Sequence, residues 1–283
     1  MTDAVARPPR PPGPSRSRGG DDQPNSADSL TRDLMAAAFA LVDAATAASI
    51  PLRLIGSVAV VECCPAHRDL LPALGRRPVR DIDVVAYSRD KKRVKALFAD
   101  GGYLLDPAIR HSEEFGIKRL IYHHPSGRYK VDVFLDKLVM AHTIDLRDRL
   151  EPDSPTVTLV DLLLSKLQIH AITENDLIDL AVLLAEHDAA PGQAIDVDHL
   201  ARIMARDWGF HRTTMDNLET LDAALHRFDA LPSASTAAAR ARITAIERTV
   251  EGVRKTRAWR LRARIGTRLR WYEEVGEVDP GRR

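Results

Sequence analysis

The chain places two acids at alternate positions of an apolar, β-branched run, Asp81-Ile82-Asp83-Val84-Val85. Successive side chains of a strand point to opposite faces, so both carboxylates project from the same face. A second such run, Lys130-Val131-Asp132-Val133-Phe134, carries one acid, and a Gly56-Ser57 pair precedes both runs. Carboxylate oxygens are the ligands that Mg²⁺ prefers, so the two runs together predict a metal site.

Composition places the chain among soluble globular proteins. It has 283 residues, 45% of them hydrophobic and 29% charged, which suits one large or two small domains. No apolar stretch reaches the 18 residues of a membrane span, and the N-terminus lacks the apolar core of a signal peptide. The two cysteines, Cys63 and Cys64, are adjacent and cannot link distant segments. We expect a cytoplasmic protein without structural disulfides.

The charge is unevenly distributed. The net charge of +1 combines eight basic residues between Arg254 and Arg270 with a remainder of about −7. This basic stretch also contains Trp259, and Trp271 follows it directly. Three interpretations are open: an RNA-binding segment that uses cations for phosphates and aromatic rings for bases, a solvated helix whose tryptophans pack inward, or an amphipathic membrane-surface helix.

Periodicity predicts an α+β fold, in which a mixed sheet flanked by helices is followed by a C-terminal helical domain. We expect helices at 29–49, 91–100, 159–170 and 174–187, strands at 52–55, 80–85, 118–122, 128–135 and 156–158, and a helix after Gly56-Ser57. Residues 62–79 predict an irregular connection, and 197 onward predicts helices broken near Gly209, Pro232 and Gly276. The expected domains are a disordered tail (1–28), an α/β domain (29–190) and a helical domain (195–283), with the boundary at 188–195.

Each candidate residue has a structural and a functional interpretation. An Asp-x-Asp pair also occurs as two solvent-facing acids on an edge strand. Lys166, on an otherwise apolar helix, either extends to the surface or contacts a phosphate. Asp176 and Asp179 are either helix N-terminal acids or site residues. The spacings of His111, His123, His124 and His170 match no zinc pattern, and a hairpin tip favours exposed histidines.

The order of these motifs resembles the nucleotidyltransferase superfamily that includes DNA polymerase β. Its pattern is a Gly-Ser turn, an Asp-x-Asp strand and then a third acid in an apolar strand, here Ile55-Gly56-Ser57, Asp81-Ile82-Asp83 and Val131-Asp132-Val133. Within it the chain looks most like the AbiEii/MenT toxin-type branch. Arg77 matches an arginine of that branch, Lys166 its helical lysine, and Asp176 and Asp179 its Asp-x-x-Asp motif. Val79 replaces a threonine, and the spacer after Ser57 is longer than usual.

The resemblance implies a site and a reaction. Gly56 and Ser57 would hold the β- and γ-phosphates of an NTP, and Lys166 would contact the triphosphate. Asp81 and Asp83 would bind two Mg²⁺ (or Mn²⁺) ions, and Asp132 would bind the catalytic ion and help to deprotonate the incoming hydroxyl. The expected reaction transfers NMP to an RNA 3′ end, such as that of tRNA, or to a protein hydroxyl.

This function has expected partners and two alternatives. The expected partners are the NTP and a tRNA or other RNA bound by the basic segment. A cognate antitoxin is a further expected partner if the protein is the toxin of a toxin–antitoxin pair. One alternative is nucleotidylation of a small molecule such as an aminoglycoside, against which the basic segment argues. The other is a nucleotidyltransferase fold that binds nucleotide or RNA without turnover.

Overall fold

The computed structural model describes residues 26–107, 109 and 119–274 of the chain. Most of the predicted tail, together with His111 and Gly276, lies outside the described residues. Residues 26–28, expected in the tail, instead form the first turn of α1 (Ser26–Ala47). Within the described part of the chain, no helix is both long and apolar enough to cross a bilayer.

A mixed five-stranded sheet is the centre of the N-terminal half, with strand order β1-β2-β5-β4-β3. The strands are β1 (Leu52–Ile55), β2 (Ile82–Ala86), β3 (Leu104–Leu105), β4 (Arg119–His123) and β5 (Lys130–Leu135). β1 runs antiparallel to β2, β2 runs parallel to β5, and β4 and β5 form the predicted antiparallel hairpin. The two acid-bearing strands, which together predict a metal site, are therefore neighbours in the sheet.

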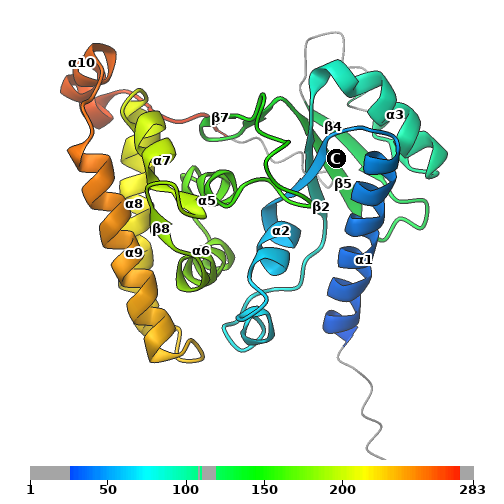
Figure 1. Ribbon diagram of the computed structural model, residues 1–283, viewed down its shortest axis with the longest axis horizontal. Coiled ribbons are helices and arrows are strands. Elements are labelled where there is room, and N and C mark those ends of the chain that lie inside the picture. Colours follow the sequence, from blue (N-terminus) through cyan, green and yellow to red (C-terminus); the bar gives the residue numbers. More distant parts are fainter. Residues whose placement is uncertain (1–25, 108, 110–118, 275–283) are drawn as a thin grey trace, which may run out of the picture.

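Helices flank the sheet as its apolar faces require. α2 (Gly56–Cys63) follows β1 without a loop, and α3 (Lys91–Asp100) has the predicted bounds. α1 and α3 lie on the side of the sheet away from the C-terminal helices (Figure 1). The irregular connection after α2 contains one short 3₁₀ turn, Arg68–Leu70, and Thr156 makes only an isolated bridge to Leu54.

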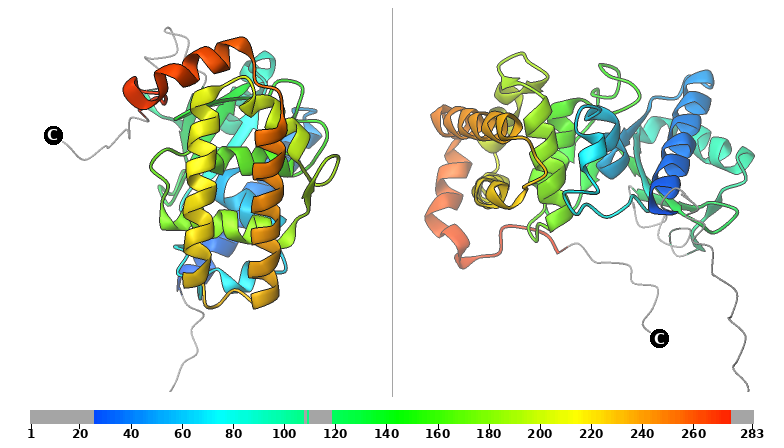
Figure 2. Two further views of the ribbon diagram at one scale, coloured as in Figure 1. Left: turned by 90° about the vertical axis from the view of Figure 1, so that its left-hand side faces the viewer. Right: turned by 90° about the horizontal axis from the view of Figure 1, so that it is seen from below.

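The C-terminal half is helical. Its helices are α5 (Leu159–Leu167), α6 (Glu174–Glu186), α7 (Val197–Met204), α8 (Trp208–Ala224), α9 (Ser233–Gly252) and α10 (Arg257–Ile265). α8 and α9 lie side by side as an outer layer, and α10 crosses one end of it (Figure 2). α9 packs along α6, so helices from both sides of the predicted boundary at 188–195 are in contact. The division into domains stays a prediction.

Short elements and helix breaks depart from the predictions. β6 (Lys137–Val139) pairs with β7 (Thr143–Asp145), and β8 (Ala189–Ala190) pairs with β9 (Ile195–Asp196). The break predicted near Gly209 is present at 205–207, and Gly209 itself lies in the first turn of α8. A further, unpredicted break separates α9 from α10. The chain is thus an α+β protein with a mixed sheet and several C-terminal helices, as the sequence predicts.

Candidate functional site

The three predicted acids meet at one end of the sheet. Asp83 on β2 is the register partner of Asp132 on the parallel strand β5, so both side chains project from the same face. Asp81 precedes β2 directly. They line a cleft of about 270 Å³, here called the acid cleft. Its lining residues are Ile55, Gly56, Asp81, Asp83, Arg119, Lys130, Asp132, Phe134, Leu138, Met140, Ser165, Lys166, Ile169 and Asp176.

The turn from β1 into α2 lies against one of these acids. Gly56 has φ +71°, and a Cβ atom there would lie 2.5 Å from Oδ2 of Asp83. Only glycine fits both the left-handed backbone and this close approach. α2 starts at Gly56 without a side-chain cap, so its first N–H groups have no capping side chain. Ser57 is half-buried and does not line the cleft.

Two cations that sequence reasoning did not single out hold Asp132. Nη2 of Arg119 lies 2.7 Å and Nζ of Lys130 3.0 Å from Oδ2 of Asp132, and Lys130 also lies 3.7 Å from Oδ2 of Asp81. Oδ1 of Asp132 is buried without a hydrogen-bond partner. The Lys130-x-Asp132 spacing on a strand was a usable signal, because it places both side chains on one face.

Asp83 has the least compensated charge of the three acids. Among the described residues, no side chain or backbone group makes a hydrogen bond or ion pair with its carboxyl group. Burial, together with the charges of Asp81 and Asp132, raises the pKa of Asp83 to about 7. A cation bound beside Asp83 would remove this repulsion.

The residues present fit a hard divalent cation. Within the described residues no three His, Cys, Asp or Glu side chains form a ready-made metal cluster. Mg²⁺ is, however, commonly bound by one or two protein carboxylates, with substrate phosphates and water completing its shell. The unpartnered Oδ1 of Asp132 and the carboxyl group of Asp83, both at the acid cleft, could supply two such ligands. Asp81, ion-paired with Lys130, lies at the rim.

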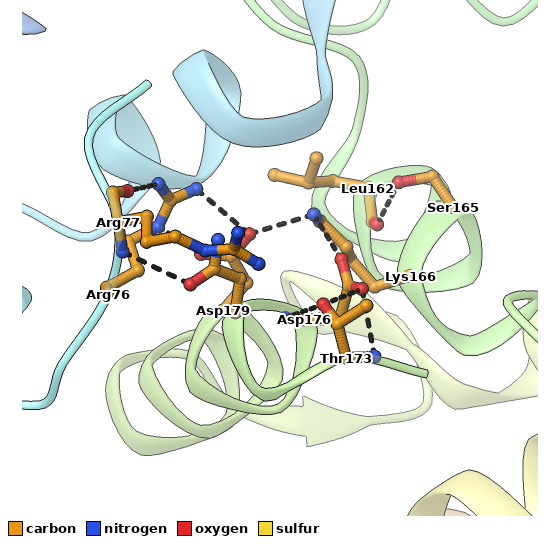
Figure 3. Close-up of polar contacts among 9 residues, drawn as sticks. Arg76, Arg77, Leu162, Ser165, Lys166, Thr173, Asp176 and Asp179 are labelled. Atoms are coloured by element: carbon orange, nitrogen blue, oxygen red, sulfur yellow. Dashed lines mark hydrogen bonds and ion pairs between the residues drawn. The ribbon is translucent and has the colours of Figure 1, made fainter. Parts of the chain in front are cut away.

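Lys166 is buried and paired rather than extended to the surface, so the surface interpretation is wrong. Its Nζ lies 2.8 Å from Oδ2 of Asp179 and 3.0 Å from Oδ1 of Asp176 (Figure 3). Burial lowers the pKa of Lys166, but the carboxylates of Asp179 and Asp176 outweigh it and raise the pKa above its ordinary value. The ammonium group therefore stays charged at the wall of the acid cleft.

Asp176 and Asp179 have different surroundings. Asp176 forms a capping box with Thr173 at the start of α6, which supports the interpretation as a helix N-terminal acid, and it also lines the acid cleft. Burial raises the pKa of Asp176, but Lys166 and Thr173 lower it overall. Asp179 is fully buried, pairs with Arg76 and Lys166, and does not line the cleft.

Arg76, and not the predicted Arg77, takes part in the buried network of ion pairs. Nε of Arg76 donates to Oδ1 of Asp179 at 2.8 Å, and its Nη2 donates to Oδ2 at 3.2 Å (Figure 3). The side chain of Arg77 is exposed, and its backbone N–H donates to Oδ1 of Asn175. Arg76 thus connects the long spacer to α6 and, through Asp179, to Lys166.

The cysteines and the hairpin histidine have no part in this site. Cys64 is buried, and burial raises the pKa of its thiol well above its usual range; Cys63 is half-buried beside Thr156. His123 is exposed at the end of β4, as expected.

No protein-family model and no curated protein sequence matches this chain. Its function is therefore inferred from its own residues and geometry.

Proposed function

We propose that the protein is a metal-dependent nucleotidyltransferase with a nucleotidyltransferase-type fold, as the order of its motifs suggests. The single observation that carries the proposal is the register pairing of Asp83 with Asp132, next to the glycine turn that opens α2. This arrangement places two carboxylates beside the N-terminus of a helix, which favours a bound anion. A metal–triphosphate complex has the matching charges.

The residues of the acid cleft have distinct roles in this proposal. Backbone N–H groups at the start of α2 donate to the phosphates of an NTP, and Lys166 contributes a permanent positive charge. Asp83 and Oδ1 of Asp132 hold Mg²⁺ or Mn²⁺, which when bound neutralises phosphate charge and polarises the α-phosphate. Asp132 also accepts the proton of the attacking hydroxyl, and Arg119 and Lys130 keep its side chain in place. The hydroxyl oxygen forms a bond to the α-phosphorus, while the bond from the α-phosphorus to the departing pyrophosphate breaks.

The acceptor we propose is an RNA 3′ end. The arginines in and around α10 favour a polyanion over a small molecule or a neutral protein side chain. A toxin role with a cognate antitoxin stays a prediction of the resemblance.

A second candidate function has an observation of its own. Arg119 and Lys130 already neutralise Asp132, and a site with that charge balance suits nucleotide binding without turnover. Wild-type protein that binds an NTP but releases no pyrophosphate with any acceptor RNA would favour this candidate.

The test is transfer of label from each α-³²P-NTP to total tRNA in the presence of Mg²⁺ or Mn²⁺. We expect labelled RNA from wild type and a loss of at least about 100-fold in Asp83→Asn and Asp132→Asn, because each removes a metal ligand. Asp229→Asn is the matched control, since Asp229 is exposed in the turn after α8. Labelling that survives in both Asn variants would overturn the proposal, and labelling of an aminoglycoside instead of RNA would redirect it.

A further inference from the structure

A second and larger cleft lies where the C-terminal segment returns to the body of the protein. It has a volume of about 530 Å³, within the range of ligand sites in proteins. We call it the C-terminal cleft. Its lining residues are Ala141, His142, Thr143, Arg206, Asp207, Trp208, Gly209, Ala258, Trp259, Arg262, Arg270, Trp271, Tyr272 and Glu273.

Three contacts fix the segment that forms one wall of this cleft. A Cβ atom at Gly209 would lie 2.4 Å from the backbone oxygen of Trp271, so glycine in the first turn of α8 permits this approach. Nε1 of Trp271 donates to Oγ1 of Thr213 at 3.2 Å. The backbone N–H of Glu273 donates to the oxygen of Ala141, in the β6–β7 turn, at 3.0 Å. The wall is therefore bound to both α8 and the β6–β7 hairpin.

Half-buried aromatic rings and an arginine line the cleft. The guanidinium carbon of Arg262 lies 4.7 Å from the ring centroid of Trp208, whose ring packs edge-on against Trp271 at 6.3 Å. The ring of Tyr272 stacks on His170 at 3.5 Å. Indole, phenol and guanidinium planes are the groups on which proteins stack unpaired bases.

The charge of the cleft favours an anion. It contains three arginines, Arg206, Arg262 and Arg270, against two acids, Asp207 and Glu273, and Arg270 also forms an ion pair with Glu274 at 2.8 Å. Asp207 caps α8 by accepting from the N–H of Phe210, whereas the exposed side chain of Arg206 has no partner among the described residues. Arg257, Arg260 and Arg264 lie on the opposite face of α10 from Arg262 and add to the positive field without lining the cleft.

The C-terminal cleft adjoins the acid cleft at two points of the chain. Met140 lines the acid cleft and Ala141 the C-terminal cleft. Ile169 lines the acid cleft, and the next residue, His170, stacks on Tyr272 of the other. Neighbouring residues of the chain therefore connect the two clefts.

From this geometry we propose that the C-terminal cleft binds unpaired nucleotides of a single-stranded RNA. The bases stack on Trp208 and Trp271, and Arg206 contacts the phosphates. The identification of this RNA as the acceptor rests on the proposed function, whereas the binding itself does not. The exposed Leu261, Ile265 and Leu269 of the same region make a lipid surface or a protein the competing occupants, which the test must separate.

Intrinsic fluorescence tests the site in the unmodified protein, because all three tryptophans of the chain line this cleft. We expect a 12-nucleotide single-stranded RNA to quench tryptophan emission, because its bases stack on indole rings. Inorganic polyphosphate and a blunt RNA duplex, which lack unpaired bases, should leave the emission nearly unchanged. Quenching by polyphosphate equal to that by RNA, or a response only to anionic lipid vesicles, would overturn the proposal. Equal quenching by single-stranded DNA would extend the ligand to both nucleic acids.

Fluorescence anisotropy of a labelled single-stranded RNA locates the binding. Trp208→Ala should weaken binding about tenfold, and Trp208→Phe, which keeps a stacking ring, should restore most of it. Phe39→Ala, at a half-buried aromatic residue of α1, is the matched control. Arg206→Ala should weaken binding and reduce its dependence on salt, whereas Arg248→Ala, at an exposed arginine of α9, should do neither. Binding by folded Trp208→Ala equal to wild type would refute the assignment.

The two proposals fail in different measurements. RNA binding is measured without NTP or metal, so it stands or falls independently of transfer. Asp83→Asn should bind the RNA as wild type does while it loses label transfer. Transfer without quenching would place the acceptor elsewhere, and quenching without transfer would leave an RNA-binding protein without the proposed activity.

Discussion

The charged side chains at the acid cleft and at the C-terminal cleft differ in burial and in pairing. In the wall of the first, buried charges are paired in a chain that runs from Arg76 through Asp179 and Lys166 to Asp176. At the second, Arg206 is exposed and has no partner among the described residues, and neither does Arg260 beside the cleft on the outer face of α10. Desolvation makes an unpaired buried charge costly, whereas exposed charges remain available to a ligand. The buried pairs therefore hold Lys166 in place at the acid cleft, and the exposed arginines are available for binding.

The largest expected effect comes from breaking the buried chain of charges. Asp179→Asn leaves Arg76 and Lys166 without their shared carboxylate, in a place where the Asp179 side chain is 0% exposed. We expect a loss of about 3–5 kcal/mol in the free energy of unfolding, measured by urea denaturation. Arg260→Ala, the matched change in the C-terminal region, should cost less than about 0.5 kcal/mol. Similar losses in the two variants would contradict the comparison.

Sequence periodicity was sufficient for the main elements. The bounds of α3 and the hairpin of β4 and β5 follow from local patterns, because nearby residues determine such elements. The parallel pairing of β2 with β5 joins Asp83 to Asp132, 49 positions further along the chain, and periodicity does not predict it. These two acids could be expected in one site only from the order of the motifs and the resemblance that it carries.

The partners of the site residues could not be predicted, because they depend on contacts between distant segments. Arg76 rather than Arg77 reaches Asp179, more than a hundred residues further along the chain. Arg119 reaches Asp132 diagonally across the strand pair, because its own register partner is Phe134. The close approach of Trp271 to Gly209 depends on where the C-terminal segment returns, so the helix-breaking tendency of glycine predicts the nearby break but not this contact. A single sequence contains no record of such pairings.

Substitution of two glycines, one beside the acid cleft and one at the end of α9, should change the free energy of unfolding by different, moderate amounts. Gly56→Ala forces a Cβ to 2.5 Å from Oδ2 of Asp83 on a backbone with φ +71°, and we expect a loss of about 1–3 kcal/mol in the free energy of unfolding. Gly252→Ala, at the end of α9 with open space around it, should be neutral or stabilise by up to about 1 kcal/mol. Urea denaturation of both variants measures the difference. A neutral Gly56→Ala would show that the β1–α2 turn is not held against Asp83.

The smallest expected effect is on the pH dependence of stability, and it comes from His142 in the lining of the C-terminal cleft. His142 is buried, stacks on Phe210 and lies 2.8 Å from Oγ1 of Thr213 through its Nε2. Burial lowers the pKa of His142, His170 lowers it further, and Asp207 partly opposes them. The unfolded chain therefore binds a proton near pH 6.5 that the folded protein does not, so stability falls as the pH drops below about 6.5.

His142→Gln should reduce this acid sensitivity, and we expect its stability loss between pH 7.5 and pH 5.5 to be smaller than that of wild type by about 1 kcal/mol. Burial also lowers the pKa of His199 and His211, so part of the wild-type dependence should remain in the variant. Urea midpoints at the two pH values measure the effect. An unchanged pH dependence in His142→Gln would mean that the ring is protonated as readily in the folded protein as in the unfolded chain. In that case the floor of the C-terminal cleft would carry a positive charge at acidic pH, and RNA binding there would strengthen as the pH falls.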